Sequence, residues 1–208
     1  MPRRPRFSDA QILDGTATLV ADGGLGAATI GAIGALLDAP SGSIYHRFPT
    51  RDVLLGRLWL RKASFFQDRF VAALGHADPW IAGREAALSL PGSVRADFAA
   101  ARVMLLHRRD DFLSPGWPAD MNDEAARLGR QVDDAMNDIT RRLFGRVTSK
   151  TLRLATFAIL DIPFAAVHRH VANNVMPASY VDELIDSAYS ALISRRAVHL
   201  HRPRQTEQ

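Results

Sequence analysis

The chain has 208 residues, of which 47% are hydrophobic and 23% charged, as in ordinary globular proteins. It has no cysteine, which excludes a disulfide framework, a thiol nucleophile and a thiolate metal site. The formal net charge of +4 is compatible with nucleic-acid binding but is too small to indicate it alone.

No apolar segment follows the N-terminal arginines, as a signal peptide would require, and we expect no apolar run of membrane-spanning length. We therefore expect a cytoplasmic protein with no membrane partner. The length suffices for one ample core, or for a small head and a larger body.

A basic arm precedes the first predicted helix and consists of Arg3, Arg4 and Arg6. Taken alone, such an arm is most simply a solubilising tail.

The first helix begins at the capping box Ser8-Asp9-Ala10-Gln11, runs through Ala21 and ends at Gly23-Gly24.

Two short helical patterns then meet at a tight turn within residues 29–55. Thr29 is a good N-cap for the first, because its hydroxyl can accept a free backbone N–H, and Ile30, Ile33 and Leu37 share one face. The sequence Asp38-Ala39-Pro40 interrupts the pattern, and Pro40 suits the first turn of a second helix.

The second short helix is predicted over residues 41–47 and is expected to bury Ile44, and Phe48 beyond its end. An ordinary helical hairpin in an all-α core is the simplest interpretation of such a pair. The second helix is too polar for that, however, since Tyr45, His46 and Arg47 fall together on it and a basic arm precedes it. The layout favours a helix-turn-helix DNA reader.

These residues resemble the DNA-binding domain of the tetracycline-repressor (TetR) family of bacterial regulators. The match needs no gap from residue 24 to 55 and is carried by Gly24-Leu25, Thr29-Ile30, Ile33-Gly34, Gly42-Ser43-Ile44-Tyr45-His46-Arg47-Phe48, Arg51, Leu54 and Leu55. Three positions depart from the family pattern. Asp38 replaces a turn glycine, Pro40 replaces a capping Ser or Thr, and Gly31 stands where some members place a base-reading Arg. Asp tolerates the left-handed turn conformation better than most residues, so the turn is expected to survive.

The resemblance implies a set of DNA-binding residues. Tyr45, His46, Arg47 and Arg51 correspond to the phosphate-contacting set, with Thr29, Ser41, Gly42 and Ser43 beside them, and we expect the arginine arm to contact phosphates or the minor groove. Between Asp38 and Ile44 there is no Arg, Lys, Asn or Gln, the residues that make bidentate base contacts. We therefore expect specificity to come largely from half-site spacing and DNA shape.

The rest of the chain also reads as helices, with no alternating strand pattern, so the predicted fold class is all-α: a three-helix DNA-binding head followed by a helical bundle. The expected helices span residues 50–74, 78–90, from 93 onward, 119–144, 148–173 and 179–198. Pro91-Gly92 is expected to end one of them, residues 114–118 to form a loop, and Pro163 to bend the helix that contains it. The predicted domains are residues 1–51 (head), 52–198 (ligand binding and dimerisation) and 199–208 (polar tail).

The last two helices each carry an apolar stripe. Both stripes could face the core of their own domain. The resemblance implies instead that these helices pair with their symmetry mates in a homodimer, with Phe157, Leu160, Val167, Leu184, Ala188 and Leu192 at the interface. Two heads one helical turn apart would match a palindromic operator in double-stranded DNA.

Aromatic and sulfur side chains are plentiful in the body, and plain core packing is the simplest role for most of them. A domain that senses an apolar molecule needs such side chains and a few polar groups. We therefore expect a small, largely apolar effector and name as candidate contacts Trp59, Phe66, Phe98, Arg102, Met104, His107, Trp117, Asp161 and Phe164.

No catalytic or metal-binding spacing rises above chance. His168 and His170 would point to different faces of a helix. We therefore expect no enzyme activity, no cofactor and no metal. The predicted function is a DNA-binding transcriptional regulator, in particular a repressor released by a small molecule. The resemblance implies that the ligand enters between the long helix and the bundle and shifts that helix, which links head and body. The alternative is a helical small-molecule-binding protein or enzyme that does not bind DNA.

Overall fold

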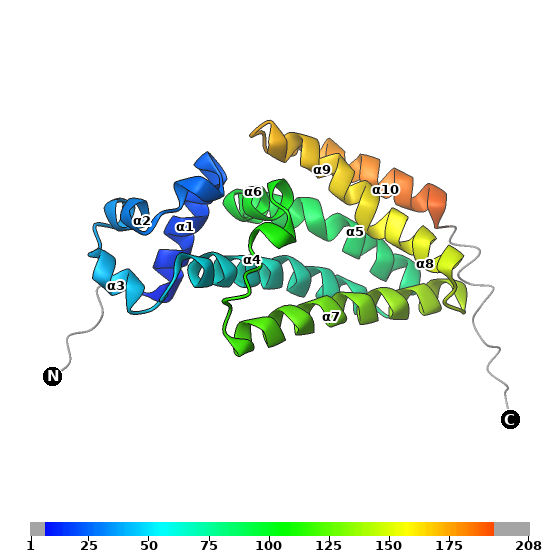
Figure 1. Ribbon diagram of the computed structural model, residues 1–208. Coiled ribbons are helices and arrows are strands. Elements are labelled where there is room, and N and C mark those ends of the chain that lie inside the picture. The colour runs from blue at the N-terminus through cyan, green and yellow to red at the C-terminus, as the bar shows by residue number, and fades with distance from the viewer. Residues whose placement is uncertain (1–6, 194–208) are drawn as a thin grey trace, which may run out of the picture. The chain divides into compact units, whose positions relative to one another are not determined.

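The computed structural model describes residues 7–193, and within them the chain is all-α with no strand. The predicted contacts of Arg3, Arg4 and Arg6, and the predicted polar tail, lie outside the described residues. Figure 1 shows the helices in chain order.

The chain divides into two compact units. One comprises the residues up to Ser64 together with Asp97–Ala126, and the other comprises Phe65–Ala96 and the residues from Arg127 on. Two long helices, α4 (Arg51–Leu74) and α7 (Ala119–Phe144), contribute residues to both units. The functional boundary predicted near Arg51 is a separate matter and stays a prediction.

The first unit is a cluster of short helices with the beginnings of the two long ones. Besides parts of α4 and α7 it contains α1 (Asp9–Gly23), the 3-10 turn Leu25–Ala27, α2 (Ile30–Leu37), α3 (Ser41–Tyr45), α6 (Phe98–Leu106) and the 3-10 turn Arg109–Asp111. The predicted capping box is present at α1, where Ser8 Oγ accepts from the N–H of Gln11 at 3.2 Å and Gln11 Oε1 accepts from the N–H of Ser8 at 2.8 Å. Fully buried Ile12, Ile33 and Leu54 bring α1, α2 and α4 to one core.

The second unit is a helical bundle. It contains the remaining parts of α4 and α7 with α5 (Pro79–Ala96), α8 (Ser149–Thr156), the π-helical segment Phe157–Asp161, α9 (Ile162–Ala172) and α10 (Tyr180–Leu192). The helix α5 packs against α9 and α10 (Figure 1).

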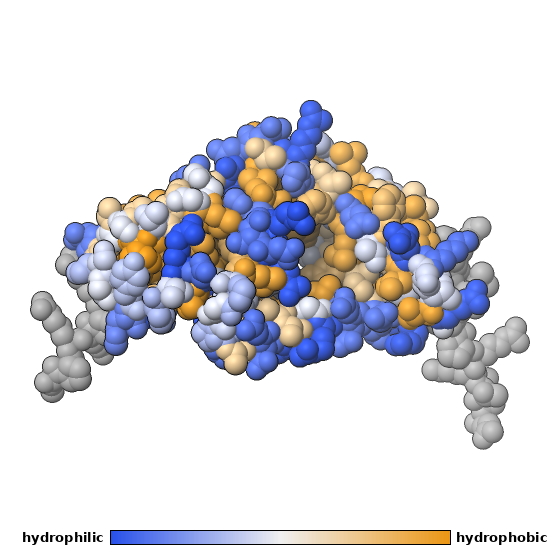
Figure 2. Space-filling view, viewed as in Figure 1, coloured by the Kyte–Doolittle hydropathy of each residue, from blue (hydrophilic) through white to orange (hydrophobic). Residues whose placement is uncertain are grey.

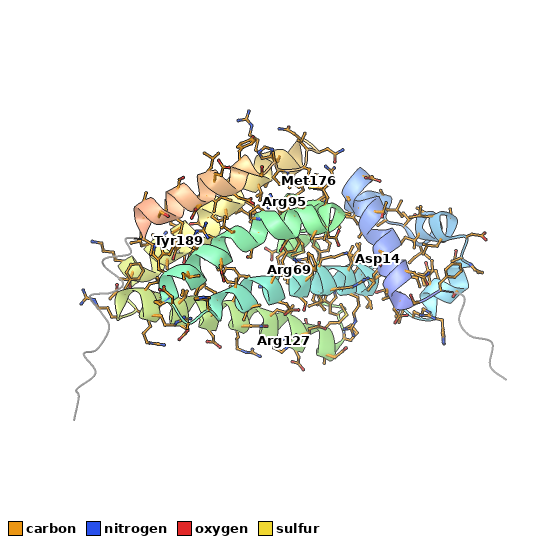
Figure 3. The ribbon with its side chains drawn as sticks, turned by 180° about the vertical axis from the view of Figure 1, so that it is seen from behind. Asp14, Arg69, Arg95, Arg127, Met176 and Tyr189 are labelled. Carbon is orange, nitrogen blue, oxygen red and sulfur yellow. The ribbon has the colours of Figure 1, made fainter. Side chains whose placement is uncertain are left out.

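Ion pairs and a tyrosine fasten α5 to α10. The guanidinium of Arg84 donates to both oxygens of Asp186, at 2.5 and 2.8 Å, and that of Arg95 donates to both oxygens of Asp182, at 3.1 and 2.7 Å. Tyr189 is fully buried, and its hydroxyl donates to the carbonyl of Trp80 at 3.0 Å. Figure 3 labels Arg95 on α5 and Tyr189 on α10.

Glycine allows the close approach of these two helices. A Cβ on Gly83 of α5 would lie 2.3 Å from the hydroxyl oxygen of Tyr189, so no larger residue fits there without a shift. Burial raises the pKa of the Tyr189 hydroxyl, which therefore stays protonated and able to donate.

The predicted end of a helix at Pro91-Gly92 is wrong. The helix α5 continues through Pro91 to Ala96, and Asp97 rather than Ser93 caps the next helix, accepting from the N–H of Ala100 at 2.8 Å. Proline removes one intrahelical hydrogen bond, at a cost of about 3 kcal/mol. The buried face on both sides of Pro91, including Ala82, Ala86 and Val94, offsets that loss by packing.

The helix that contains Pro163 is irregular just before the proline, and the predicted bend stays a prediction. Five residues before it, Phe157–Asp161, form a π-helical segment, in which the N–H of Ile162 donates to the carbonyl of Phe157. Proline at 163 has no N–H for the carbonyl of Ile159, so the usual hydrogen-bond ladder is interrupted there.

The expectation that no apolar segment reaches membrane-spanning length is wrong, because one helix has the length and the composition to do so. Among the described residues, the continuous helical stretch Ser149–Ala172 is long and apolar enough, with a mean hydropathy of 1.3 over its most apolar window. One such helix is weak support for a membrane protein, because an interior helix of a soluble protein passes the same test.

Candidate nucleic-acid interface

A tight turn joins α2 to α3. Asp38 adopts the left-handed conformation, with φ 50° and ψ 44°, as expected for the residue that replaces glycine there. The N–H of Ala39 then donates to the carbonyl of Gly34 at 2.8 Å. A Cβ on Gly34 would lie 2.8 Å from the carbonyl oxygen of Ala39, so the turn requires glycine at that position.

Thr29 caps α2 as predicted. Its Oγ1 accepts from the N–H of Ala32 at 3.1 Å, while the residue remains exposed. The hydroxyl proton of Thr29 stays available as a donor, because capping uses the oxygen only as an acceptor.

The helix α3 has one buried apolar side and one exposed polar side. Ile44 is fully buried and Phe48, just after the helix, is 4% exposed. Ser41, Gly42, Tyr45 and His46 are exposed, and Ser43 is half-buried. The helix is shorter than predicted, since it ends at Tyr45 and places His46 and Arg47 in a turn. Pro40 precedes the first turn as the N-cap residue instead of lying within it.

A shallow open groove runs between α2 and α3. Its lining residues are small, which lets a neighbouring surface approach the backbone closely: Gly31, Gly34, Ala35, Asp38, Ala39, Pro40 and Ser41. This groove and the exposed side of α3 form the surface that the sequence predicts for DNA. The individual contacts with DNA stay predictions.

Arg47 has a partner within the head. Its guanidinium donates to Asp9 at the start of α1, and the Asp9 carboxylate is well exposed. The sequence did not predict this pair. Asp9 lies 38 positions before Arg47, and the local pattern does not show which acidic residue Arg47 will contact.

Arg51 also has partners that the sequence did not reveal. Its Nε donates to the carbonyl of Ala28 at 3.0 Å, and a second nitrogen donates to the carbonyl of Leu25. Both carbonyls belong to the connection between α1 and α2. The half-buried Arg51 therefore holds this connection against the start of α4.

The residues predicted for ligand binding are divided between the two units. Trp59, Phe98, Arg102, Met104, His107 and Trp117 belong to the first unit, whereas Phe66, Asp161 and Phe164 belong to the second. Trp59 and Trp117 are buried, and Trp117 lies against Gly56, where a Cβ would come within 2.4 Å of its ring. Arg102 donates to the carbonyl of Ala21 at 2.7 Å. These three pack or form hydrogen bonds within the first unit, and their contact with a ligand stays a prediction.

The remaining candidates include His107 in the first unit and Asp161 and Phe164 in the second. Burial lowers the pKa of His107, whose ring lies edge-on to that of Phe112 with 6.1 Å between centroids. Asp161 is exposed. Phe164 is also exposed and stacks on His168 with 5.2 Å between ring centroids.

A mostly apolar cavity of about 150 Å³, partly open to solvent, lies in the second unit. Among the predicted ligand contacts, only Phe66 lines it. Its walls come from α4, α5, α7 and the π-helical segment: Phe66, Gln67, Phe70, Ala86, Ser89, Leu90, Val132, Ile159 and Leu160.

The residues predicted for a dimer interface fall into two groups. Phe157 and Leu184 are 48% and 60% exposed, which is unusual for such large apolar side chains. Leu160, Ala188 and Leu192 are half-buried. Val167 is fully buried within the monomer, so its assignment to an exposed interface is wrong. Figure 2 shows hydrophobic surface on the side of the second unit where α8 and α9 lie.

Within residues 7–193, no group of three or more His, Asp or Glu side chains is placed to hold a metal ion. His168 and His170 contact different aromatic partners, Phe164 and Tyr180 respectively.

Residues 12–58 match the family model described as bacterial regulatory proteins, tetR family. No curated protein matches the chain. Among solved structures, the TetR family transcriptional regulator PfmR from Thermus thermophilus is similar with a TM-score of 0.70 and 17% identity, covering 90% of this chain and 96% of that one.

Two further solved structures share the fold. The transcriptional regulator FadR from Bacillus subtilis, in complex with stearoyl-CoA, has a TM-score of 0.69 and 17% identity over 90% of this chain and 98% of its own. A TetR-like transcriptional regulator from Rhodococcus sp. RHA1 has a TM-score of 0.67 and 18% identity over 94% of this chain and 100% of its own.

Proposed function

We propose that the protein is a homodimeric repressor that binds a palindromic operator and leaves it when a small, largely apolar ligand binds, because residues 12–58 match the tetR family model. The chain has the fold of TetR-family transcriptional regulators. The observation that supports DNA binding most directly is the turn at Gly34 and Asp38, which holds the polar side of α3 outward while Ile44 anchors it.

The proposed contacts are of two kinds. Tyr45, His46 and Thr29 are exposed and carry hydrogen-bonding groups suited to phosphates, which position a protein on DNA without reading sequence. Ser41 and Ser43 can bond several bases, so half-site spacing and DNA shape would supply much of the specificity. On DNA binding, Arg47 would break its ion pair with Asp9 and form one with a DNA phosphate instead.

Release would follow from a coupling between the ligand and the heads. A ligand that binds better to a conformation with a different head separation weakens operator binding by population shift. A coupling of about 1–3 kcal/mol corresponds to roughly a 5- to 150-fold loss of DNA affinity.

A gel shift with the DNA upstream of the protein's own gene tests the proposal. We expect a specific complex at least about 10³-fold tighter than with random DNA of the same length, and its loss in the double variant Tyr45→Ala, His46→Ala. The control is Val147→Ala, an exposed apolar residue that belongs to the second unit. Equal affinity for both DNAs would contradict sequence-specific binding and support the helical carrier or enzyme instead. A reporter gene behind the bound DNA distinguishes repression from activation.

A further inference from the structure

We propose that the cavity in the second unit selects a ligand of about one aromatic ring that donates a single hydrogen bond to Gln67 and carries no charge. This inference rests on the proposed ligand-released regulator and specifies its effector by chemical class.

Gln67 supplies the polar contact. Its Oε1 is buried and has no hydrogen-bond partner, one of two such side-chain atoms in the described part of the chain. Buried polar groups are normally paired, so an unpaired acceptor in a cavity wall marks the place of a missing donor. The other atom, Trp117 Nε1, belongs to the first unit, where its ring packs against Gly56.

The rest of the wall is chemically simple. Apart from Gln67, Ser89 and the small Ala86, every lining residue has a large aliphatic or aromatic side chain. The hydroxyl of Ser89 already donates to the carbonyl of Ala86 at 2.7 Å, so this hydroxyl takes part in a hydrogen bond within the protein. Gln67 Oε1 has no such bond, so it is the acceptor in the lining that gains most from a ligand donor.

The wall contains no Arg, Lys, His, Asp or Glu. A charged ligand group held against this wall would lose contact with water and gain no counter-ion, at a cost far larger than that of a neutral hydroxyl. The cavity therefore disfavours carboxylates, phosphates and ammonium groups.

The volume sets the size. A cavity of about 150 Å³ is the size that accepts benzene when its walls are apolar. The stearoyl-CoA in the Bacillus subtilis FadR structure is both far larger and anionic, so this cavity would hold only a small part of such a ligand and offers its charged groups no counter-ion.

Phenol and toluene test the inference, because they have the same shape and differ in one hydroxyl. We expect isothermal titration calorimetry on the full chain without DNA to show that both compounds bind. Phenol should bind more tightly than toluene, because Gln67 Oε1 can accept a hydrogen bond from its hydroxyl. In Gln67→Leu, phenol affinity should fall about three- to tenfold relative to toluene, the size of one net hydrogen bond. Benzoate should not bind.

Gln131→Leu on α7 is the matched control, since this glutamine lies outside the cavity lining and its loss should leave the phenol-to-toluene ratio unchanged. Gln67→Met gives the same comparison if the Leu variant does not fold. Equal losses for phenol and toluene in either Gln67 variant, or no binding of phenol to the wild-type chain, would overturn the inference.

A gel shift with phenol separates this inference from the proposed function. If phenol binds through Gln67 but operator affinity is unchanged, the cavity assignment is supported and the ligand-released switch is contradicted. If operator DNA is bound but phenol is not, the DNA-binding function stands and the ligand class is wrong.

Discussion

Gly34 is the residue on which the geometry of the helix-turn-helix depends most directly. A Cβ there would lie 2.8 Å from the backbone oxygen of Ala39, and a backbone atom cannot move aside as a flexible side chain can. We expect Gly34→Ala to destabilise the first unit by about 1–3 kcal/mol, as overpacking does, and to weaken DNA binding. Thermal unfolding followed by circular dichroism and a DNA titration measure the two effects.

Gly31 provides the control on the same helix. An added Cβ at Gly31 would meet no atom within 4 Å. Because alanine is the better helix former, Gly31→Ala should stabilise α2 by about 0.5–1 kcal/mol. If the two alanine variants were equally stable, the close approach at Gly34 would not be what fixes the turn.

Arg51 is expected to position the head as well as to favour DNA electrostatically. Since its guanidinium bonds the carbonyls of Ala28 and Leu25, Arg51→Ala should lower stability by about 1–3 kcal/mol, the range for hydrogen bonds from charged donors. Arg51→Lys should lose most of this stability too, because an ammonium does not reproduce the two-pronged geometry.

The salt dependence of DNA binding separates the two roles of Arg51. A phosphate contact alone predicts that Arg51→Ala lowers the slope of log affinity against log salt by roughly one, with unchanged thermal stability. A purely structural role predicts lower stability and an unchanged slope. We expect both quantities to fall in Arg51→Ala, and unchanged thermal stability would contradict the positioning role.

Local features at the residue scale were predictable from the sequence, and distant partners were not. The caps at Ser8 and Thr29 and the left-handed Asp38 follow from rules that involve neighbours within four residues. The partners of Arg47 and Arg51 lie more than 20 residues away. A sequence alone does not show which of several carboxylates or carbonyls such a side chain will meet.

At the scale of elements, α5 shows where a local rule fails. Pro91-Gly92 is a strong signal for a helix end, yet α5 runs on to Ala96. The Pro-Gly pair indicates only that one hydrogen bond is lost. The sequence signal does not include the packing of the buried face of α5, which extends on both sides of Pro91. The loss of a hydrogen bond at Pro163 was predictable, and the π-helical segment before it was not.

The pair of Arg84 and Asp186 between α5 and α10 should make stability depend on pH. The hydrogen bond from Arg84 lowers the pKa of Asp186 below its ordinary value, so the carboxylate binds protons less readily in the folded chain than in the unfolded one. The stabilisation is then fully present above the ordinary pKa of about 4 and is lost as the pH falls through the lower folded pKa.

We therefore expect Asp186→Asn to lower the free energy of unfolding at pH 7 but to differ less from the wild type near pH 3. The effect should be under about 1 kcal/mol, because both side chains are about one-third exposed to water. Urea unfolding at the two pH values measures it, with the exposed Asp133→Asn as the control. A deficit that is equal at both pH values would argue against the pairing as its cause.

At the scale of the whole molecule, the fold class and the DNA-binding head were predictable, but the grouping of the body residues was not. The helical periodicities and the motif from 24 to 55 are continuous in the sequence. The predicted ligand contacts were chosen by residue type, and folding places six in one unit and three in the other. Gln67, which lines the cavity, gave no signal because a single glutamine in an amphipathic helix is usually solvated.

The exposed apolar side chains of the second unit lead to the prediction of a dimer. Leu184 is 60% exposed, and Phe157, Phe164 and Tyr180 are between 43% and 52% exposed. Large apolar side chains exposed to this extent are typical of interaction sites when they lie together. A two-fold dimer buries the same patch from both subunits, and only a dimer offers two heads to a palindromic operator.

Leu184→Glu should therefore convert the dimer to a monomer in analytical ultracentrifugation, because it places two carboxylates in an apolar interface without counter-ions. The monomer should lose most of its operator affinity while the head remains folded. Leu113→Glu changes an apolar residue of the first unit that is 38% exposed, and it should leave the protein dimeric. A wild-type chain that sediments as a monomer at micromolar concentration, or a Leu184→Glu variant that stays dimeric, would show that this surface does not hold two subunits together.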